Sequence, residues 1–300
     1  AWRRGRLQTP VSHPPSRGED RLTATILIDG LPAAADDLHY LALVNYAAVT
    51  SFRVEDGGVR GLDLHLARLH ASAIEMFGLA VEEERLRDLM DRALSGRKDA
   101  WLRVSLFSPF IWARLPSDRV RPKVMTAVAP PPPPLADSVR LQSQTYVRDA
   151  AHLKHTATFP LIRARRLAQD AGFDDALFAD EAGLISEGSL WNIGFVRGDR
   201  IVWPKAPMLS GVAQALIQRG LAEQGLSSET RPVHLGDIAA FDGAFLCNSA
   251  TPVCPITAID DAVFAIDRSI LDRLARAWAS QPPQAIAARD DDEAVSSLGR

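Results

Sequence analysis

The second half of the chain is organised around a stretch that reads FDDALFADEAGLISEGSLWNIGFV, from Phe173 to Val196. Short apolar runs at Ala176–Ala179 and Leu190–Val196 predict two strands, because turn-forming residues separate them. Glu187 follows the turn and precedes the second strand. A carboxylate at such a strand edge is positioned to face a ligand.

Helical and strand patterns alternate on both sides of this stretch. We expect a helix at Thr158–Ala171, a strand at Arg200–Trp203, a helix from Gly211 to about Glu223, strands near Glu229–Val233 and Ala244–Cys247, and a late helix over about Asp267–Ser280. In the first half we expect a strand at Ala24–Gly30, a hairpin over Ala48–Leu62, helices beginning at Asp63 and Glu82, and strands at Trp101–Phe107 and Val124–Val128. The order predicts an α+β (α/β) protein.

Five consecutive prolines at Pro130–Pro134 separate the two halves. Proline cannot donate to a strand ladder and favours an extended conformation, so we interpret the run as a linker. We expect a disordered extension at 1–22, an N-terminal α/β domain at 23–129, the linker at 130–136, a larger C-terminal cofactor-binding domain at 137–286 and a disordered tail at 287–300.

Composition excludes several classes of protein. A net charge of −3 argues against nucleic acid as the main partner. No apolar run is long enough for a membrane helix, and the first residues lack the apolar core of a signal peptide. Cys247 and Cys254 have no further cysteine with which to build a metal site, and we expect both to be reduced. We therefore expect a cytoplasmic protein that binds neither nucleic acid, membrane nor metal.

One lysine is conspicuous against this composition. The 34 basic residues include only four lysines, Lys98, Lys123, Lys154 and Lys205, which leaves thirty arginines. Arginine stays protonated in proteins, whereas a desolvated lysine loses its proton and forms a Schiff base. Codon bias alone could leave four lysines, so composition by itself makes Lys154 only a candidate for a catalytic lysine.

Three residues elsewhere in the sequence would suit a ligand that has a pyridine ring and a phosphate group. Glu187 could hold a proton on a ring nitrogen, as a pyridinium cofactor requires. Arg68 lies in the strongest helix of the first half, and Gly211 precedes a helix start. An arginine and a helix N-terminus together suit a phosphate monoester.

The ordered motifs HLARLHASA, LKH, FDDALFADEAGLISEGSLWNIGFV, MLSGV and FLCNSATPVCPI resemble the class IV aminotransferase family. That family includes branched-chain and D-amino-acid transaminases and 4-amino-4-deoxychorismate lyase, and the resemblance covers most of residues 24–265. It implies a pyridoxal 5′-phosphate enzyme of fold type IV, with a small N-terminal α/β domain and a larger C-terminal pseudo-barrel. It also implies a cofactor between the domains and a homodimer.

The resemblance assigns a role to each matching residue. Lys154 matches the Schiff-base lysine, Glu187 the partner of the pyridine nitrogen and Arg68 the phosphate-binding arginine. It further implies a cofactor-binding set made of Leu209, Gly211, Val212, Ala213 and Ser249. Ala213 departs from the usual threonine, so one hydroxyl contact to the phosphate is missing, and Ser249 could supply part of it.

The substrate side is less well defined. Phe159 replaces a tyrosine found in some branched-chain transaminases, and Tyr46, Arg53 and Ala250 are further candidates for substrate contact. Arg53 could pair with a carboxylate, although it could equally be a surface residue of a strand. Two other candidates look structural: His155 should point away from Lys154 because strand neighbours alternate, and Trp191 should belong to the core.

Two activities fit the resemblance. A transaminase would move an amino group from an amino acid or primary amine to a keto acid, whereas the lyase would eliminate pyruvate from aminodeoxychorismate. LKH, TSFRV and CNSATPVCPI favour the lyase, whereas SEGSLWNIGF and the makeup of the family favour a transaminase, which is our prediction. A relative without catalytic activity is a third alternative, and the presence of Lys154, Glu187 and Arg68 argues against it.

Overall fold

The computed structural model describes residues 24–111, 116–133 and 135–287. The expected extension at 1–22 and nearly all of the expected tail at 287–300 lie outside these residues. The first half forms an antiparallel sheet in the order β2-β1-β6-β5-β3. Its strands are β1 (Thr25–Ile28), β2 (Leu31–Pro32), β3 (Ala47–Val54), β5 (Ala100–Phe107) and β6 (Lys123–Ala129).

Helices of the first half bury an apolar stripe against this sheet. They are α1 (Ala35–Leu43), α2 (Leu62–Phe77) and α3 (Glu83–Leu94). In α2, Leu66, Leu69 and Ala73 recur at helical spacing and pack into one core with strands β3 and β5. Gly61, with φ 69°, supplies the left-handed backbone that turns the chain into α2.

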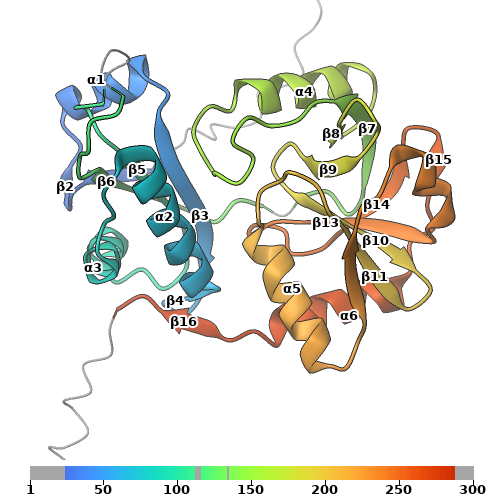
Figure 1. Cartoon of the computed structure of the whole chain (residues 1–300). Coiled ribbons are helices and arrows are strands. Elements are labelled where there is room, and N and C mark those ends of the chain that lie inside the picture. The colour runs from blue at the N-terminus through green and yellow to red at the C-terminus, as the bar shows by residue number, and fades with distance from the viewer. Residues whose placement is uncertain (1–23, 112–115, 134, 288–300) are drawn as a thin grey trace, which may run out of the picture.

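The second half forms a larger, strongly curved sheet in the order β12-β11-β10-β13-β14-β7-β8-β9, with β15 paired to β14 (Figure 1). Its strands are β7 (Val139–Thr145), β8 (Asp175–Ala179), β9 (Ile185–Gly188), β10 (Asn192–Arg197), β11 (Arg200–Pro204), β12 (Ser228–Arg231), β13 (Gly243–Cys247), β14 (Cys254–Ile259) and β15 (Ala262–Val263). Its helices are α4 (Phe159–Asp170), α5 (Val212–Glu223), the short 3₁₀ helix η1 (Leu235–Ala240) and α6 (Arg268–Ala279). These layers confirm the predicted α+β class.

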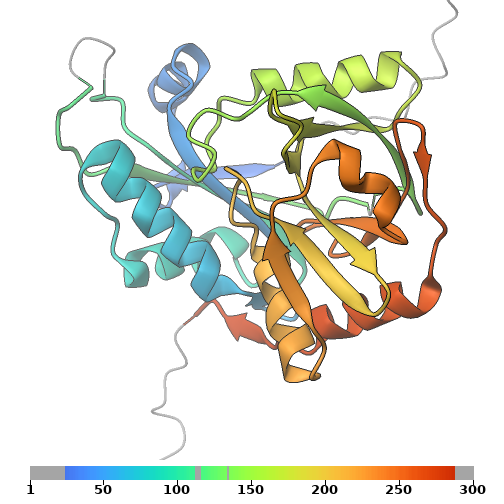
Figure 2. The same ribbon diagram turned by 45° about the vertical axis from the view of Figure 1, so that its right-hand side comes forward.

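The end of the chain returns to the first half. Strand β16 (Pro283–Ala285) pairs antiparallel with β4 (Gly58–Arg60), and Figure 2 shows this segment leaving the second sheet to cross over. Ile286, 1% exposed, joins the core of the first half. Residues from both ends of the described chain therefore stabilise the same layer.

Among the described residues, no helix is both long and apolar enough to cross a membrane.

Candidate active site

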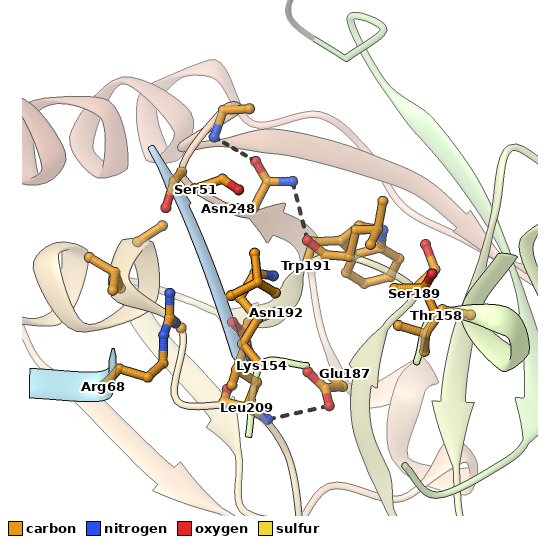
Figure 3. Close-up of a pocket in the computed structure, with 18 of the residues that line it drawn as sticks. Ser51, Arg68, Lys154, Thr158, Glu187, Ser189, Trp191, Asn192, Leu209 and Asn248 are labelled. Carbon is orange, nitrogen blue, oxygen red and sulfur yellow. Dashed lines mark hydrogen bonds between the residues drawn. The ribbon is translucent and has the colours of Figure 1, made fainter. Parts of the chain in front are cut away.

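A cavity of about 340 Å³ opens where the two sheets meet (Figure 3). Strands β3 and β5 of the first sheet contribute Val49, Ser51, Trp101 and Arg103 to its wall. The remaining wall comes from α2 and the second half. The cavity is thus assembled from segments far apart in the sequence.

Lys154 lies in this cavity, on the connection between β7 and α4. Its carbonyl accepts a hydrogen bond from the Val49 N–H at 2.7 Å, and the next residue, His155, forms a bridge with Ala48 of β3. Burial is the main cause that lowers the pKa of Lys154 from 10.5 to about 8, and the Arg68 guanidinium adds to it. A lysine in this state is a nucleophile near neutral pH.

Glu187 faces the cavity from strand β9, where the sequence predicted only the residue after a turn. Its Oε1 accepts hydrogen bonds from Arg148 Nη1 at 3.2 Å and from the Leu209 N–H at 3.3 Å. The side chains of Arg148 and Glu187 are 8% and 7% exposed. Burial raises the pKa of Glu187, and the Arg148 guanidinium opposes that rise. Both contacts fall on Oε1, and no described residue forms a hydrogen bond with Oε2.

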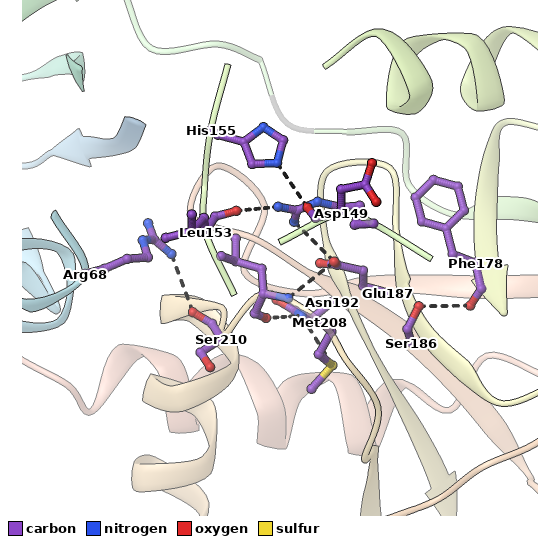
Figure 4. Close-up of polar contacts among 12 residues, drawn as sticks. Arg68, Asp149, Leu153, His155, Phe178, Ser186, Glu187, Asn192, Met208 and Ser210 are labelled. Carbon is purple, nitrogen blue, oxygen red and sulfur yellow. Dashed lines mark hydrogen bonds and ion pairs between the residues drawn. The ribbon is translucent and has the colours of Figure 1, made fainter. Parts of the chain in front are cut away.

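Arg148 was not predicted from the sequence. It also donates to the Leu153 carbonyl, one residue before Lys154, so it ties the lysine segment to Glu187 (Figure 4). In the sequence it is one of thirty arginines. Only its position six residues before Lys154 could have drawn attention to it.

Arg68 reaches the cavity from α2. Its Nη2 donates to Thr50 Oγ1 at 2.7 Å, and its Nη1 lies 3.5 Å from the Ser210 carbonyl oxygen. Its Nε is buried and has no hydrogen-bond partner among the described residues. Burial lowers the pKa of Arg68 to about 10, which still leaves it a cation at neutral pH. In Figure 3, Lys154 lies between Arg68 and Glu187.

Helix α5 begins at the cavity, with Gly211 as its N-cap. A Cβ on Gly211 would lie 1.9 Å from Asn192 Oδ1, and the Asn192 amide is itself held by the Leu209 carbonyl at 2.9 Å. Only glycine fits this contact. The first N–H groups of a helix lack intrahelical acceptors, so Val212 and Ala213 offer donors to an anion.

The structure brings most of the predicted site residues together. Lining the cavity are Arg68, Lys154, Glu187, Leu209, Gly211, Val212, Ala213, Ser249 and Ala250. Ala213 lines the cavity in place of the threonine that is usual in the family, and alanine offers no hydroxyl there.

Tyr46, Arg53 and Phe159 do not line the cavity, and their role on the substrate side stays a prediction. Arg53 lies on the same face of β3 as Val49 and Ser51, but it stands near the end of the strand, where it is exposed and pairs with Asp99 at 2.9 Å. The Tyr46 hydroxyl donates to the Met76 carbonyl at 3.1 Å. Phe159 is 73% exposed at the start of α4.

Conversely, His155 lines the cavity, although we expected it to point away from Lys154, and Trp191 lines the cavity too. His155 follows Lys154 in an irregular connection, so strand alternation does not apply. Its ring nitrogens contact the Asp149 carbonyl at 3.3 Å and the Ala157 N–H at 3.2 Å. Trp191 is 4% exposed and donates to Asp175 at 2.9 Å, so it belongs to the core as well as to the wall.

Arg103 is a further cavity residue that the sequence did not reveal. It lies on β5, its pKa is lowered by burial, and it makes no hydrogen bond or ion pair with any described side chain. A partly buried cation of this kind is suited to an anionic group of a ligand.

The chain is similar in sequence to several proteins named as branched-chain-amino-acid aminotransferases. A putative branched-chain-amino-acid aminotransferase of Methanocaldococcus jannaschii is 25% identical over 223 residues, or 70% of this chain and 77% of the relative. A probable branched-chain-amino-acid aminotransferase of Rickettsia bellii is 28% identical over 76% of this chain and 81% of the relative. A similarly named protein of Synechocystis matches over 37% of each chain, at 27% identity.

Solved structures share the fold. A branched-chain aminotransferase of the archaeon Thermoproteus uzoniensis has a TM-score of 0.74 at 19% identity, over 88% of this chain and 100% of that one. A putative 4-amino-4-deoxychorismate lyase of Legionella pneumophila has a TM-score of 0.72 at 20% identity, over 84% and 96%. The family model for amino-transferase class IV matches residues 47–259. The chain belongs to the class IV aminotransferase family.

Proposed function

We propose that this protein is a pyridoxal 5′-phosphate-dependent aminotransferase that moves an amino group between an amino acid or primary amine and a keto acid. One observation carries the proposal: a lysine with its pKa lowered to about 8 lies in a cavity that also holds a buried arginine and a buried carboxylate. This is the set of groups that a phosphorylated pyridine aldehyde requires.

The residues fit the cofactor at each of its polar groups. The Arg68 guanidinium lines the cavity beside the start of α5, which offers N–H groups, so together they suit a phosphate dianion. Oε2 of Glu187 suits a protonated ring nitrogen. Leu209 and Ser249 complete the wall. The missing hydroxyl at Ala213 should weaken phosphate binding by about 1.5–3 kcal/mol without abolishing it.

The residues of this chain divide the work among themselves. When bound, the cofactor supplies an electron-withdrawing ring that stabilises a carbanion. Lys154 would hold the cofactor through its amine and would move the proton at the reacting carbon. Glu187, paired with Arg148, would hold the ring nitrogen protonated. Arg103 supplies a cation for the carboxylate that amino and keto acids carry.

The lyase remains the second candidate, and the position of His155 favours it. The LKH motif led us to consider a lyase, and His155 does lie in the cavity wall beside Lys154. Both activities use the same lysine, so the cofactor site alone does not separate them.

Substrate assays separate the two activities. The protein loaded with cofactor is given L-leucine, D-alanine, a primary amine or aminodeoxychorismate, with and without 2-oxoglutarate, a keto-acid acceptor. We expect keto-acid or aldehyde formation that requires the acceptor. Pyruvate released from aminodeoxychorismate without any acceptor would reject the transaminase and establish the lyase.

We further propose a cytoplasmic homodimer. Phe159 and Ile162 of α4 are 73% and 64% exposed, and Val147 in the segment before Lys154 is 43% exposed. Large apolar side chains exposed on a helix beside the site are suited to contact with a second copy. Light scattering of the purified protein should give twice the mass of 32.7 kDa.

A further inference from the structure

Behind Arg68, on the side away from the cavity, two polar side chains are almost completely buried. Thr50 of β3 is 0% exposed and His65 of α2 is 1% exposed, and neither lines the cavity. Arg68 Nη2 lies 2.7 Å from Thr50 Oγ1, which in turn lies 2.7 Å from His65 Nδ1. The three side chains form a chain of hydrogen bonds that starts at the candidate phosphate site and ends in the core.

The direction of each hydrogen bond in this chain is fixed by its members. A guanidinium only donates, so the Thr50 oxygen accepts from Arg68. The hydroxyl hydrogen of Thr50 can then donate to His65 Nδ1 when that nitrogen is unprotonated. Arg68 Nη2 also lies 3.3 Å from this nitrogen, which again requires an acceptor there. Burial, followed by the charges of Arg68 and Lys154, lowers the pKa of His65 well below 6.5, which agrees with a neutral ring.

We propose that Thr50 and neutral His65 are positioning residues that hold the Arg68 guanidinium at the cavity beside the start of α5, where a phosphate group would bind. The inference rests on the proposed function, because the phosphate is that of the cofactor. Thr50 fixes one terminal nitrogen on the far side of the guanidinium, and His65 fixes the hydroxyl of Thr50. The other terminal nitrogen, Nη1, lies 3.5 Å from the carbonyl oxygen of Ser210, the residue before the α5 N-cap, so the guanidinium is kept at the start of that helix.

A packing role alone would predict something different. The His65 ring lies 4.7 Å from the Phe52 ring, centroid to centroid, so His65 also fills space in the core. Removing packing lowers stability and affects every ligand alike. Removing a positioning contact affects only the ligand that Arg68 binds, namely one with a phosphate group.

The test compares two aldehydes on the full-length apoprotein. Dissociation constants for pyridoxal 5′-phosphate and for pyridoxal, which lacks the phosphate, are measured by absorbance titration. Thr50→Val and His65→Phe remove the hydrogen bonds, whereas Thr50→Ser and His65→Asn retain a hydroxyl and an acceptor. Thermal unfolding of each variant without ligand reports whether it folds, and Thr50→Ala replaces Thr50→Val if the valine variant does not.

We expect Thr50→Val and His65→Phe to weaken pyridoxal 5′-phosphate about tenfold or more, as loss of a contact to a charged group would. Pyridoxal binding should be unchanged, and both conservative variants should bind as the wild type does. Equal weakening of both aldehydes, or no weakening, would overturn the inference. A wild type that binds neither aldehyde would instead contradict the proposed function.

Discussion

The reactivity of Lys154 depends on the groups packed around it. Burial contributes most to the lowering of its pKa to about 8, and the cations of Arg68, Arg148 and Arg103 act in the same direction. Glu187 acts in the opposite direction. The cavity therefore makes a larger fraction of Lys154 neutral than is found for an exposed lysine at the same pH, although a carboxylate acts on it in the opposite direction.

This environment predicts how cofactor attachment depends on pH. Lysine attacks an aldehyde only as the neutral amine, and a pKa of about 8 leaves about a tenth of it neutral at pH 7. The rate at which the apoprotein binds pyridoxal 5′-phosphate covalently should rise between pH 7 and 9, with its midpoint near 8. Stopped-flow absorbance measures this rate. A midpoint above 10, the range of an ordinary lysine, would contradict it.

The buried pair of Arg148 and Glu187 predicts a pattern of stability. Arg148→Met leaves a buried carboxylate without its partner and should lower the free energy of unfolding by about 3–5 kcal/mol. Arg148→Met combined with Glu187→Leu removes both charges and should recover part of that loss. Urea denaturation of the apoproteins gives both values. Losses that simply add would show that the two side chains are not coupled.

Single residues also show how far the sequence reaches. Lys154 could be predicted because its chemistry differs from that of arginine, and Glu187 and Arg68 because ordered motifs surround them. Arg148 and Arg103 could not be distinguished among thirty arginines, since only folding places them in the cavity.

At the scale of elements, the N-terminus of α5 is the part of the site most sensitive to backbone position. Gly211→Ala places a Cβ 1.9 Å from Asn192 Oδ1, so the first turn of α5 must shift unless the Asn192 amide leaves its hydrogen bond to Leu209. We expect pyridoxal 5′-phosphate to bind at least about tenfold more weakly, since a contact to a charged group is lost. Titration of the apoprotein measures this.

The matched control relieves the same contact from the other side. Gly211→Ala combined with Asn192→Ala removes the amide that the new methyl group would strike. This double variant should bind the cofactor more tightly than Gly211→Ala alone. If it binds no better, the position of the helix is not set by this contact.

Elements with a regular apolar period were predicted well. The helices expected at Thr158–Ala171 and Gly211–Glu223 agree with α4 and α5 to within one or two residues. Strand β9 was missed because its four residues are too few for a period and lie in a turn-rich context. Strand β16 contains a proline, and the sequence gives no sign of its distant partner β4.

At the scale of the whole molecule, the last described residues stabilise the first half. Ile286 is 1% exposed in the core that holds α2 and α3. Ile286→Ala should lower the free energy of unfolding by about 2–5 kcal/mol. Val263→Ala is a matched control, because that side chain is 81% exposed, and it should have little effect. Urea denaturation compares them, and equal effects would contradict the crossover of β16.

The curvature of the second sheet and the crossover of β16 also explain why the cavity was not predictable from local patterns. Val49 and Trp101 of the first sheet line the same cavity as Ser249, which lies between β13 and β14 and more than a hundred residues further along the chain. Local periodicity specifies elements, whereas the meeting of two sheets depends on long-range packing. The family resemblance supplied what periodicity could not.

The most direct test is to locate the cofactor on the chain. The protein is incubated with pyridoxal 5′-phosphate, reduced with borohydride, digested and mapped by mass spectrometry, with Lys154→Ala as control. We predict that the reduced cofactor is found on the peptide containing Lys154 and is absent from the variant. Labelling confined to Lys98, Lys123 or Lys205, or no labelling, would contradict the account.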